Sequence, residues 1–211
     1  MATATTLTEK NGAAPASAPG FRPYRINTKV YQRIVASGAF GDKSRVFLWK
    51  GLLVEKVSDM TKGRPHVFAH TKLSRILSGL VPVDYFVEQD QPLDLGIDSV
   101  PEPDLKVVRG REEDYRDHDP SAREVPLVVE VADSSLSDDT GEMLREYARG
   151  GIAIYWVVNI PNQRIDVYSR PAGPAERPRF ESCQSFGPED EVPVILDGRE
   201  VGKIAVKDVL P

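Results

Sequence analysis

Two apolar runs with a helical stretch between them constrain the fold of this chain more than any other feature. Leu127–Val131 and Ile154–Val158 are short and rich in β-branched residues, as strands covered on both faces are. Residues 138–150 carry apolar side chains at helical spacing, and the glycines at their end are a stop signal. Strands joined through a helix are connected by a right-handed crossover, so we expect these two strands to be parallel.

The rest of the pattern predicts further helices and strands around this unit. A helix is expected from Asn27 or Thr28 to Gly38, and a second one from about Pro65 to Leu80. Residues 110–124 and 170–179 read as loops. Strands are expected at 46–49, 52–56, 85–88, 93–95, 104–109, 164–169, 192–196 and 203–206. This order predicts an α/β or α+β fold with a mixed central sheet flanked by helices.

Composition places the chain in a broad class. Residues 1–20 are mostly Ala, Thr, Pro, Ser and Gly, which predicts a disordered tail ahead of a single domain at 21–211. One cysteine excludes a disulfide framework, and neither a secretion signal nor a membrane span is visible, so we expect a cytoplasmic protein. The net charge of -5 argues against a protein that coats nucleic acid non-specifically, although a local basic patch stays compatible with it.

Two acids, Asp104 and Glu130, interrupt runs that otherwise belong in a buried sheet. Burying a carboxylate costs several kcal/mol unless it is paired or bound to a cation. If the two strands are neighbours, the acids meet at one end of the sheet, where they could hold Mg²⁺. Such a metal suits phosphodiester hydrolysis. The alternative is that both acids are sheet-end residues satisfied by backbone amides or arginines.

Four segments carry a resemblance to a known family. They are Glu102-Pro103-Asp104, the run Leu127–Leu136, the stretch Tyr147–Ile152 and the strand Tyr155–Asn159. Together they resemble the Uma-type family of putative restriction endonucleases, which belongs to the PD-(D/E)XK nuclease superfamily. The similarity spans roughly residues 27 to 170. It implies a restriction-endonuclease-like core, DNA as substrate, Mg²⁺ or Mn²⁺ as cofactor and a homodimer that addresses both strands.

The resemblance also implies roles for individual residues. Asp104 corresponds to the motif aspartate and Glu130 to the second metal-binding acid. The superfamily places a lysine two residues after that acid, which is Ala132 here, or in the following helix, which is Met143 here. Neither side chain can donate a hydrogen bond or carry charge. Lys106 is the candidate replacement because it shares a strand face with Asp104, and the alternative is a lysine whose stem packs along the sheet.

Other polar residues near these motifs have two interpretations each. Asp90 is a third acid near the cation or a turn residue, and His66 lies near phosphate or is a structural histidine. Arg145 and Arg149 contact phosphate or form a solvated helix face. Asp139 is explained by the favourable charge of a first helical turn. Two functions follow: a metal-dependent endonuclease, or a catalytically degenerate member that binds nucleic acid or a protein without cleavage.

Overall fold

A six-stranded mixed sheet forms the centre of the computed structural model, which describes residues 22–41, 46–55, 62–173 and 176–211. The strand order is β3-β4-β5-β6-β7-β8. β5 and β6 pair in parallel, as predicted, and the other neighbours pair antiparallel. The strands are β3 (Tyr85–Gln89), β4 (Leu105–Arg109), β5 (Leu127–Ala132), β6 (Ile154–Asn159), β7 (Arg164–Pro171) and β8 (Phe180–Phe186).

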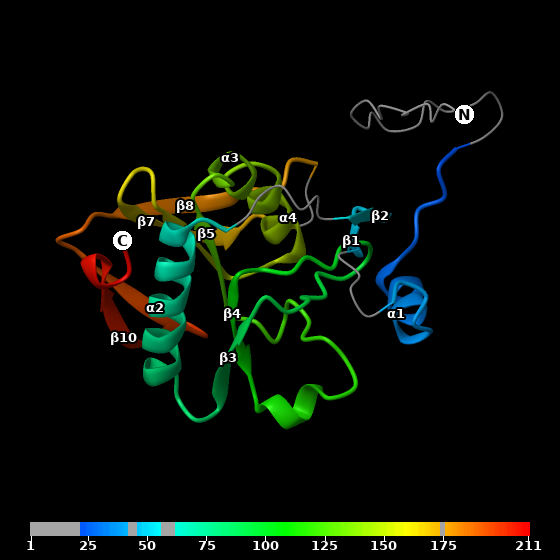
Figure 1. Cartoon of the computed structure of the whole chain (residues 1–211), viewed down its shortest axis with the longest axis horizontal. Helices are drawn as coiled ribbons and strands as arrows, with labels where there is room; N and C mark the ends of the chain where they lie inside the picture. The colour runs from blue at the N-terminus through cyan, green and yellow to red at the C-terminus, as the bar shows by residue number, and fades with distance from the viewer. Residues whose placement is uncertain (1–21, 42–45, 56–61, 174–175) are drawn as a thin grey trace, which may run out of the picture.

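Helices and two small sheets surround this centre. The helices are α1 (Thr28–Ala36), α2 (Arg64–Leu80), α3 (Leu136–Asp139) and α4 (Glu142–Gly150), with 3-10 turns η1 (Glu112–Tyr115) and η2 (Val206–Asp208). The small sheets are β1 (Val46–Trp49) with β2 (Leu52–Glu55), and β9 (Glu191–Leu196) with β10 (Arg199–Ala205). Figure 1 shows α1 and the β1–β2 hairpin at one end of the molecule, and α2 with the chain's C-terminus at the other.

Each face of the central sheet buries its own apolar cluster. Leu73 and Leu77 of α2 pack with Val129 of β5 on one face, where β9 and β10 also contribute. Tyr147 of α4 packs with Val128 of β5 on the other face. Every residue of β5 is buried, so this strand is covered on both sides as its sequence indicates. Because a buried Val or Leu side chain stabilises a fold by about 1.5–3 kcal/mol, β5 is a rigid support for any side chain at its end.

The predicted helix at residues 138–150 is two helices. α3 ends at Asp139 and α4 begins at Glu142, with Gly141 between them. A Cβ atom at Gly141 would lie 2.6 Å from the carbonyl oxygen of Ser137, a contact that real Cβ atoms do not make. The break therefore depends on a residue without a side chain, which a periodicity of apolar residues does not reveal.

The strand pattern also needs two corrections. Residues 93–95 do not form a strand: Asp94 makes an isolated bridge to Ser121, and the amide of Leu95 bonds to Ser99 within a tight loop. β8 pairs with β7 although no strand was predicted there. Its sequence, Phe-Glu-Ser-Cys-Gln-Ser-Phe, is mostly polar, since an edge strand with exposed side chains needs no apolar alternation. The predicted disordered tail at 1–20 lies outside the described residues.

Within the described residues, no helix combines the length and the apolar character that crossing a membrane requires. The longest is α2, with 17 residues, and its polar side chains interrupt the apolar ones.

Candidate active site

Asp104 and Glu130 lie next to each other where β4 begins and β5 ends. The register pairs Leu105 with Val129, so the two acids continue the same antiparallel ladder. The amide of Asp104 donates to Oε2 of Glu130 at 3.2 Å, and the amide of Val131 donates to Oδ2 of Asp104 at 2.8 Å. Both acids are buried, with 8% and 7% of their surface exposed. Neighbouring strands thus bring the two predicted acids together, and backbone amides support each of them.

Cationic and polar side chains surround the Asp104 carboxylate. Nε2 of His66, in the first turn of α2, lies 3.1 Å from Oδ2. The Lys62 ammonium donates to Oδ1 at 2.9 Å. Burial opposes ionisation of Asp104, but the hydrogen bonds and charges of His66 and Lys62 outweigh it and hold the pKa of this carboxyl well below its usual range. Asp104 is therefore an anion.

The pKa of Glu130 is shifted in the opposite direction to that of Asp104. The hydroxyl of Tyr147 on α4 donates to Oε1 at 2.7 Å. Burial, followed by the negative charges of Asp104 and Asp139, raises the pKa of Glu130 well above its usual value. A cation placed against Oε1 and Oε2 would relieve that repulsion, so the pair has the donor chemistry and the electrostatics of a divalent-metal site.

Asp139 is a third acid of this site, and the sequence interpretation missed it. Its side chain is buried at the end of α3, where the hydroxyl of Ser135 donates to Oδ2 at 2.6 Å. Burial and the charge of Asp104 raise the pKa of Asp139 to about 6, against a partial offset from the Ser135 hydrogen bond. The interpretation as a favourable charge in a first helical turn accounted for an acid at this position, but it did not predict that Asp139 lies near the two other acids. The signal for its role is its position shortly after β5, at the same sheet end as Glu130.

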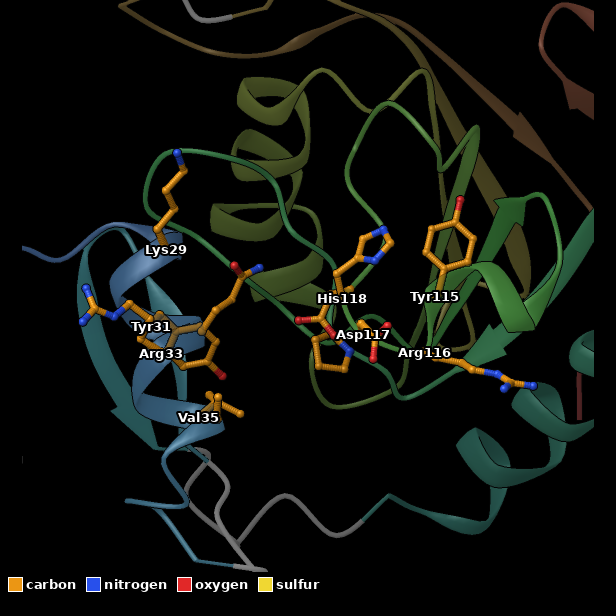
Figure 2. A pocket seen from close by; sticks show the side chains of 12 residues that line it. Lys29, Tyr31, Arg33, Val35, Tyr115, Arg116, Asp117 and His118 are labelled. Carbon is orange, nitrogen blue, oxygen red and sulfur yellow. The ribbon is translucent and has the colours of Figure 1, made fainter.

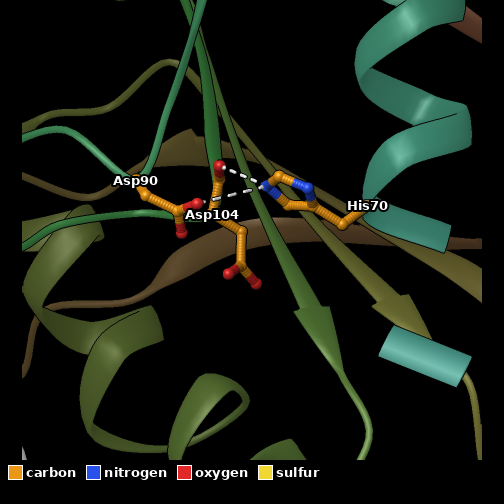
Figure 3. Close-up of side chains that lie close together, drawn as sticks. All are labelled: His70, Asp90 and Asp104. Atoms are coloured by element: carbon orange, nitrogen blue, oxygen red, sulfur yellow. Dashed lines mark hydrogen bonds and ion pairs between the residues drawn. The ribbon is translucent and has the colours of Figure 1, made fainter. Parts of the chain in front are cut away.

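His70 and Asp90 extend the acidic site on the other side of Asp104. Nε2 of His70 lies 3.0 Å from the backbone carbonyl oxygen of Asp104 and 3.8 Å from Oδ2 of Asp90 (Figure 3). One ligand atom from each of the three residues lies within 4.8 Å of the others, an arrangement that could hold a metal ion. The Lys62 ammonium reaches into this group and donates to Oδ1 of Asp90 at 2.6 Å. Asp90 is thus a partner of the site, beyond its role at a turn.

Lys106 lies within the sheet. Its ammonium forms an ion pair with Glu88 at 2.8 Å and donates to the carbonyl oxygen of Gln91 at 2.8 Å. Only 1% of the residue is exposed, and burial lowers the pKa of Lys106 although Glu88 opposes that shift. Asp104 is not among these partners. The catalytic role expected for Lys106 stays a prediction, and its ion pair with Glu88 fits the alternative of a lysine packed along the sheet.

The two positions at which the resemblance implies a lysine hold apolar side chains, and their surroundings are apolar too. Ala132 is fully buried in the cluster between the sheet and α4, and Met143 packs against the same cluster. The arginines of α4 have carboxylate partners. Arg149 pairs with Glu146 and Asp98, and Arg145 pairs with Glu142.

A hollow of about 620 Å³ lies apart from the acids, between α1 and the loop after η1. Figure 2 shows Lys29 and Arg33 of α1 across this hollow from Arg116 and His118 of the loop. Its charges are mixed, because acidic side chains of the same loop line it too. Neither Asp104 nor Glu130 lines this hollow.

Comparisons with known proteins show the family and the fold of the chain. The sequence profile of the Uma2 family, described as putative restriction endonuclease, matches residues 31–201. The crystal structure of a putative nuclease belonging to DUF820 from Anabaena variabilis is similar, with a TM-score of 0.57 and 18% identity over 78% of this chain and 88% of that chain. At this identity the likeness shows the fold alone, and it confirms the predicted nuclease-like core. A comparison with curated proteins found no match.

Proposed function

The chain belongs to the Uma2 family of putative restriction endonucleases, and from this premise we propose that it hydrolyses phosphodiester bonds in DNA with a divalent metal. Asp104 and Glu130 hold the ion, which is Mg²⁺ or Mn²⁺. The observation that carries the proposal is the meeting of these two acids where β4 begins and β5 ends, with the amide of Asp104 donating to Glu130. Hard oxygen donors of this kind are the ligands that both ions take.

Hydrogen bonds from neighbouring residues hold the two carboxylates in position to bind the metal. When bound, the metal neutralises charge on the scissile phosphate and lowers the pKa of an attacking water. His66 and the Val131 amide fix the Asp104 carboxylate, while Tyr147 fixes Glu130. Because these donors lie on α2, β5 and α4, packing of both sheet faces sets the positions of the two acids. Such support from neighbouring groups tunes metal affinity in proteins generally.

A cleavage assay tests this proposal. Supercoiled plasmid DNA is incubated with the purified protein and Mn²⁺ or Mg²⁺, next to Asp104→Asn and Glu130→Gln. We expect nicking by the native chain, loss of nicking in both variants, and no nicking with a chelator present. Calorimetry measures Mn²⁺ binding in parallel and should show a site that both substitutions remove. Equal, metal-independent activity of all three proteins would assign the cleavage to a contaminant and overturn the proposal.

A second function is favoured by the apolar side chains at Ala132 and Met143. A chain that keeps the fold and the acids but lacks the lysine could bind nucleic acid or a protein without cutting it. This candidate predicts retention of DNA by the native protein in a gel-shift assay, together with an absence of nicking at any Mn²⁺ concentration. The plasmid assay therefore separates the two functions directly.

Assembly, domain organisation and location complete the proposal. The two active sites of a symmetric dimer can cut both strands of a duplex in one binding event, so we propose that the chain acts as a homodimer. Light scattering of the purified protein measures this. A single domain at residues 21–211 predicts one cooperative unfolding transition. The expected cytoplasmic location stays a prediction of the sequence.

A further inference from the structure

Lys62 is a cation of the acidic site that no sequence motif indicates. It lies just before α2, and its ammonium donates to Oδ1 of Asp104 at 2.9 Å and to Oδ1 of Asp90 at 2.6 Å. About 45% of its side chain is exposed, whereas the Asp104 side chain is 11% exposed. The ammonium therefore lies at the border between the buried acids and the solvent from which a substrate arrives.

We infer that Lys62 supplies the positive charge of this active site, in place of the lysine absent at Ala132 and Met143. The inference rests on the proposed nuclease function. A lysine in this role orients the attacking water and stabilises negative charge on the phosphate. An ammonium has three donor hydrogens, and the two acids accept two of them. Among the described residues the ammonium has no further acceptor, so its third hydrogen remains for a water or a phosphate oxygen.

The other basic side chains around Asp104 are less suited to that role. Lys106 is almost completely buried, and Glu88 with the Gln91 carbonyl oxygen accepts its hydrogens. Nε2 of His66 contacts Asp104, and its buried Nδ1 has no hydrogen-bond partner among the described residues. Among the lysines of the described residues, only Lys62 has its ammonium in contact with the Asp104 carboxylate. Asp90 fixes the ammonium there, which gives that exposed acid a function.

The position of the ammonium has a second consequence. It lies against two members of the group formed by His70, Asp90 and Asp104, whose ligand atoms are close enough to share a metal ion. An ammonium and a divalent cation compete for the same carboxylate oxygens. The Lys62 ammonium thus excludes a metal ion from the His70 side of Asp104, and the catalytic ion binds on the Glu130 side. Removal of the ammonium should open an additional metal site that includes His70.

The experiment compares Lys62→Met, Lys62→Arg and the control Lys203→Met, which removes an exposed lysine from β10. Cleavage of plasmid DNA with Mn²⁺ is measured under single-turnover conditions, and Mn²⁺ binding is measured by calorimetry. Loss of one stabilising donor typically slows an enzyme roughly 100-fold or more, and we expect a loss of this size in Lys62→Met. We expect partial recovery in Lys62→Arg and the native rate in Lys203→Met.

Metal stoichiometry is a readout independent of cleavage. We expect Lys62→Met to bind one more Mn²⁺ per chain than the native protein, and Lys62→Met combined with His70→Ala to lose that extra ion. Native cleavage rates and native stoichiometry in Lys62→Met would overturn the inference while the nuclease function stands. A faster Lys62→Met enzyme would overturn it as well, since the ammonium would then be inhibitory. Absence of cleavage by the native protein and Asp104→Asn alike would overturn the proposed function, and this inference with it.

Discussion

The hydroxyl of Tyr147 donates to Oε1 of Glu130 at 2.7 Å, and both side chains are buried. This contact joins α4 to the end of β5 and fixes an acid that the surrounding protein does not favour as an anion. Burial and neighbouring negative charge raise the pKa of Glu130, so the metal-free fold carries an electrostatic cost at neutral pH. Sites that are arranged for a ligand commonly lower the stability of the empty protein.

Glu130→Gln should therefore stabilise the protein in the presence of a chelator. The amide oxygen can accept from the Asp104 amide, while the amide nitrogen can donate to the Tyr147 hydroxyl oxygen, so both contacts survive without the charge. We expect an increase in the free energy of unfolding of about 0.5–2 kcal/mol, measured by urea denaturation at pH 7.5. A marked destabilisation would show that the carboxylate is a net stabilising group in the metal-free fold.

Mn²⁺ should stabilise the native protein and leave Asp104→Asn unchanged. An ion that binds only the folded state at 100 times its Kd adds about 2.7 kcal/mol to the free energy of unfolding. Thermal denaturation with increasing Mn²⁺ measures this as a rising Tm. Asp104→Asn keeps the shape of the side chain but weakens an essential ligand, so its Tm should be flat over the same range. Parallel increases in both proteins would place the stabilising ion elsewhere.

Asp139 should make the metal-free protein less stable as the pH rises from about 4 to about 7. Its pKa in the folded state is about 6, above the usual 3.8, so the folded state binds its proton more tightly than the unfolded state. The contribution to stability is complete below the unfolded pKa and is lost as the pH rises through about 6. The whole effect is of the order of 2–3 kcal/mol.

Asp139→Asn tests this pH dependence. The variant has no proton to lose, so its free energy of unfolding in a chelator should fall less steeply over that pH range than that of the native protein. Glu130 titrates in the same direction, so part of the slope should remain in the variant. Identical slopes for the two proteins would mean that Asp139 ionises in the folded state as it does in the unfolded one.

The strand–helix–strand unit and the acid pair could be predicted from sequence because both leave a local pattern. β5 and β6 are continuous apolar runs, and an acid inside such a run is conspicuous. Adjacency of β4 and β5 then places Asp104 beside Glu130. These inferences need only the periodicity of strands and the cost of burying charge.

Lys62 and Asp139 could not be assigned in that way. Lys62 contacts an acid 42 residues further along the chain, and the polar sequence around it has no periodicity that would predict this contact. An acid in a first helical turn reads the same whether it faces solvent or a metal site, and the break at Gly141 decides where α3 ends. Long-range contacts and steric breaks are properties of the assembled chain.

Gly141→Ala is expected to destabilise the protein, because the break between α3 and α4 has no room for a methyl group. The new Cβ would lie 2.6 Å from the Ser137 carbonyl oxygen, which is backbone and cannot move unless α3 shifts. Overpacking of this kind costs about 1–3 kcal/mol. Since α3 carries Asp139 and α4 carries Tyr147, the Mn²⁺ affinity should fall together with the stability.

Gly79→Ala is the matched control, since it makes the same chemical change in α2. No atom outside its helix lies within 4 Å of a Cβ at Gly79, and alanine is favoured over glycine in a helix by about 0.5–1 kcal/mol. We therefore expect opposite signs for the two glycine substitutions in urea denaturation, and native Mn²⁺ affinity in the control. Stabilisation by Gly141→Ala would contradict the steric explanation and favour a continuous helix across residues 136–150.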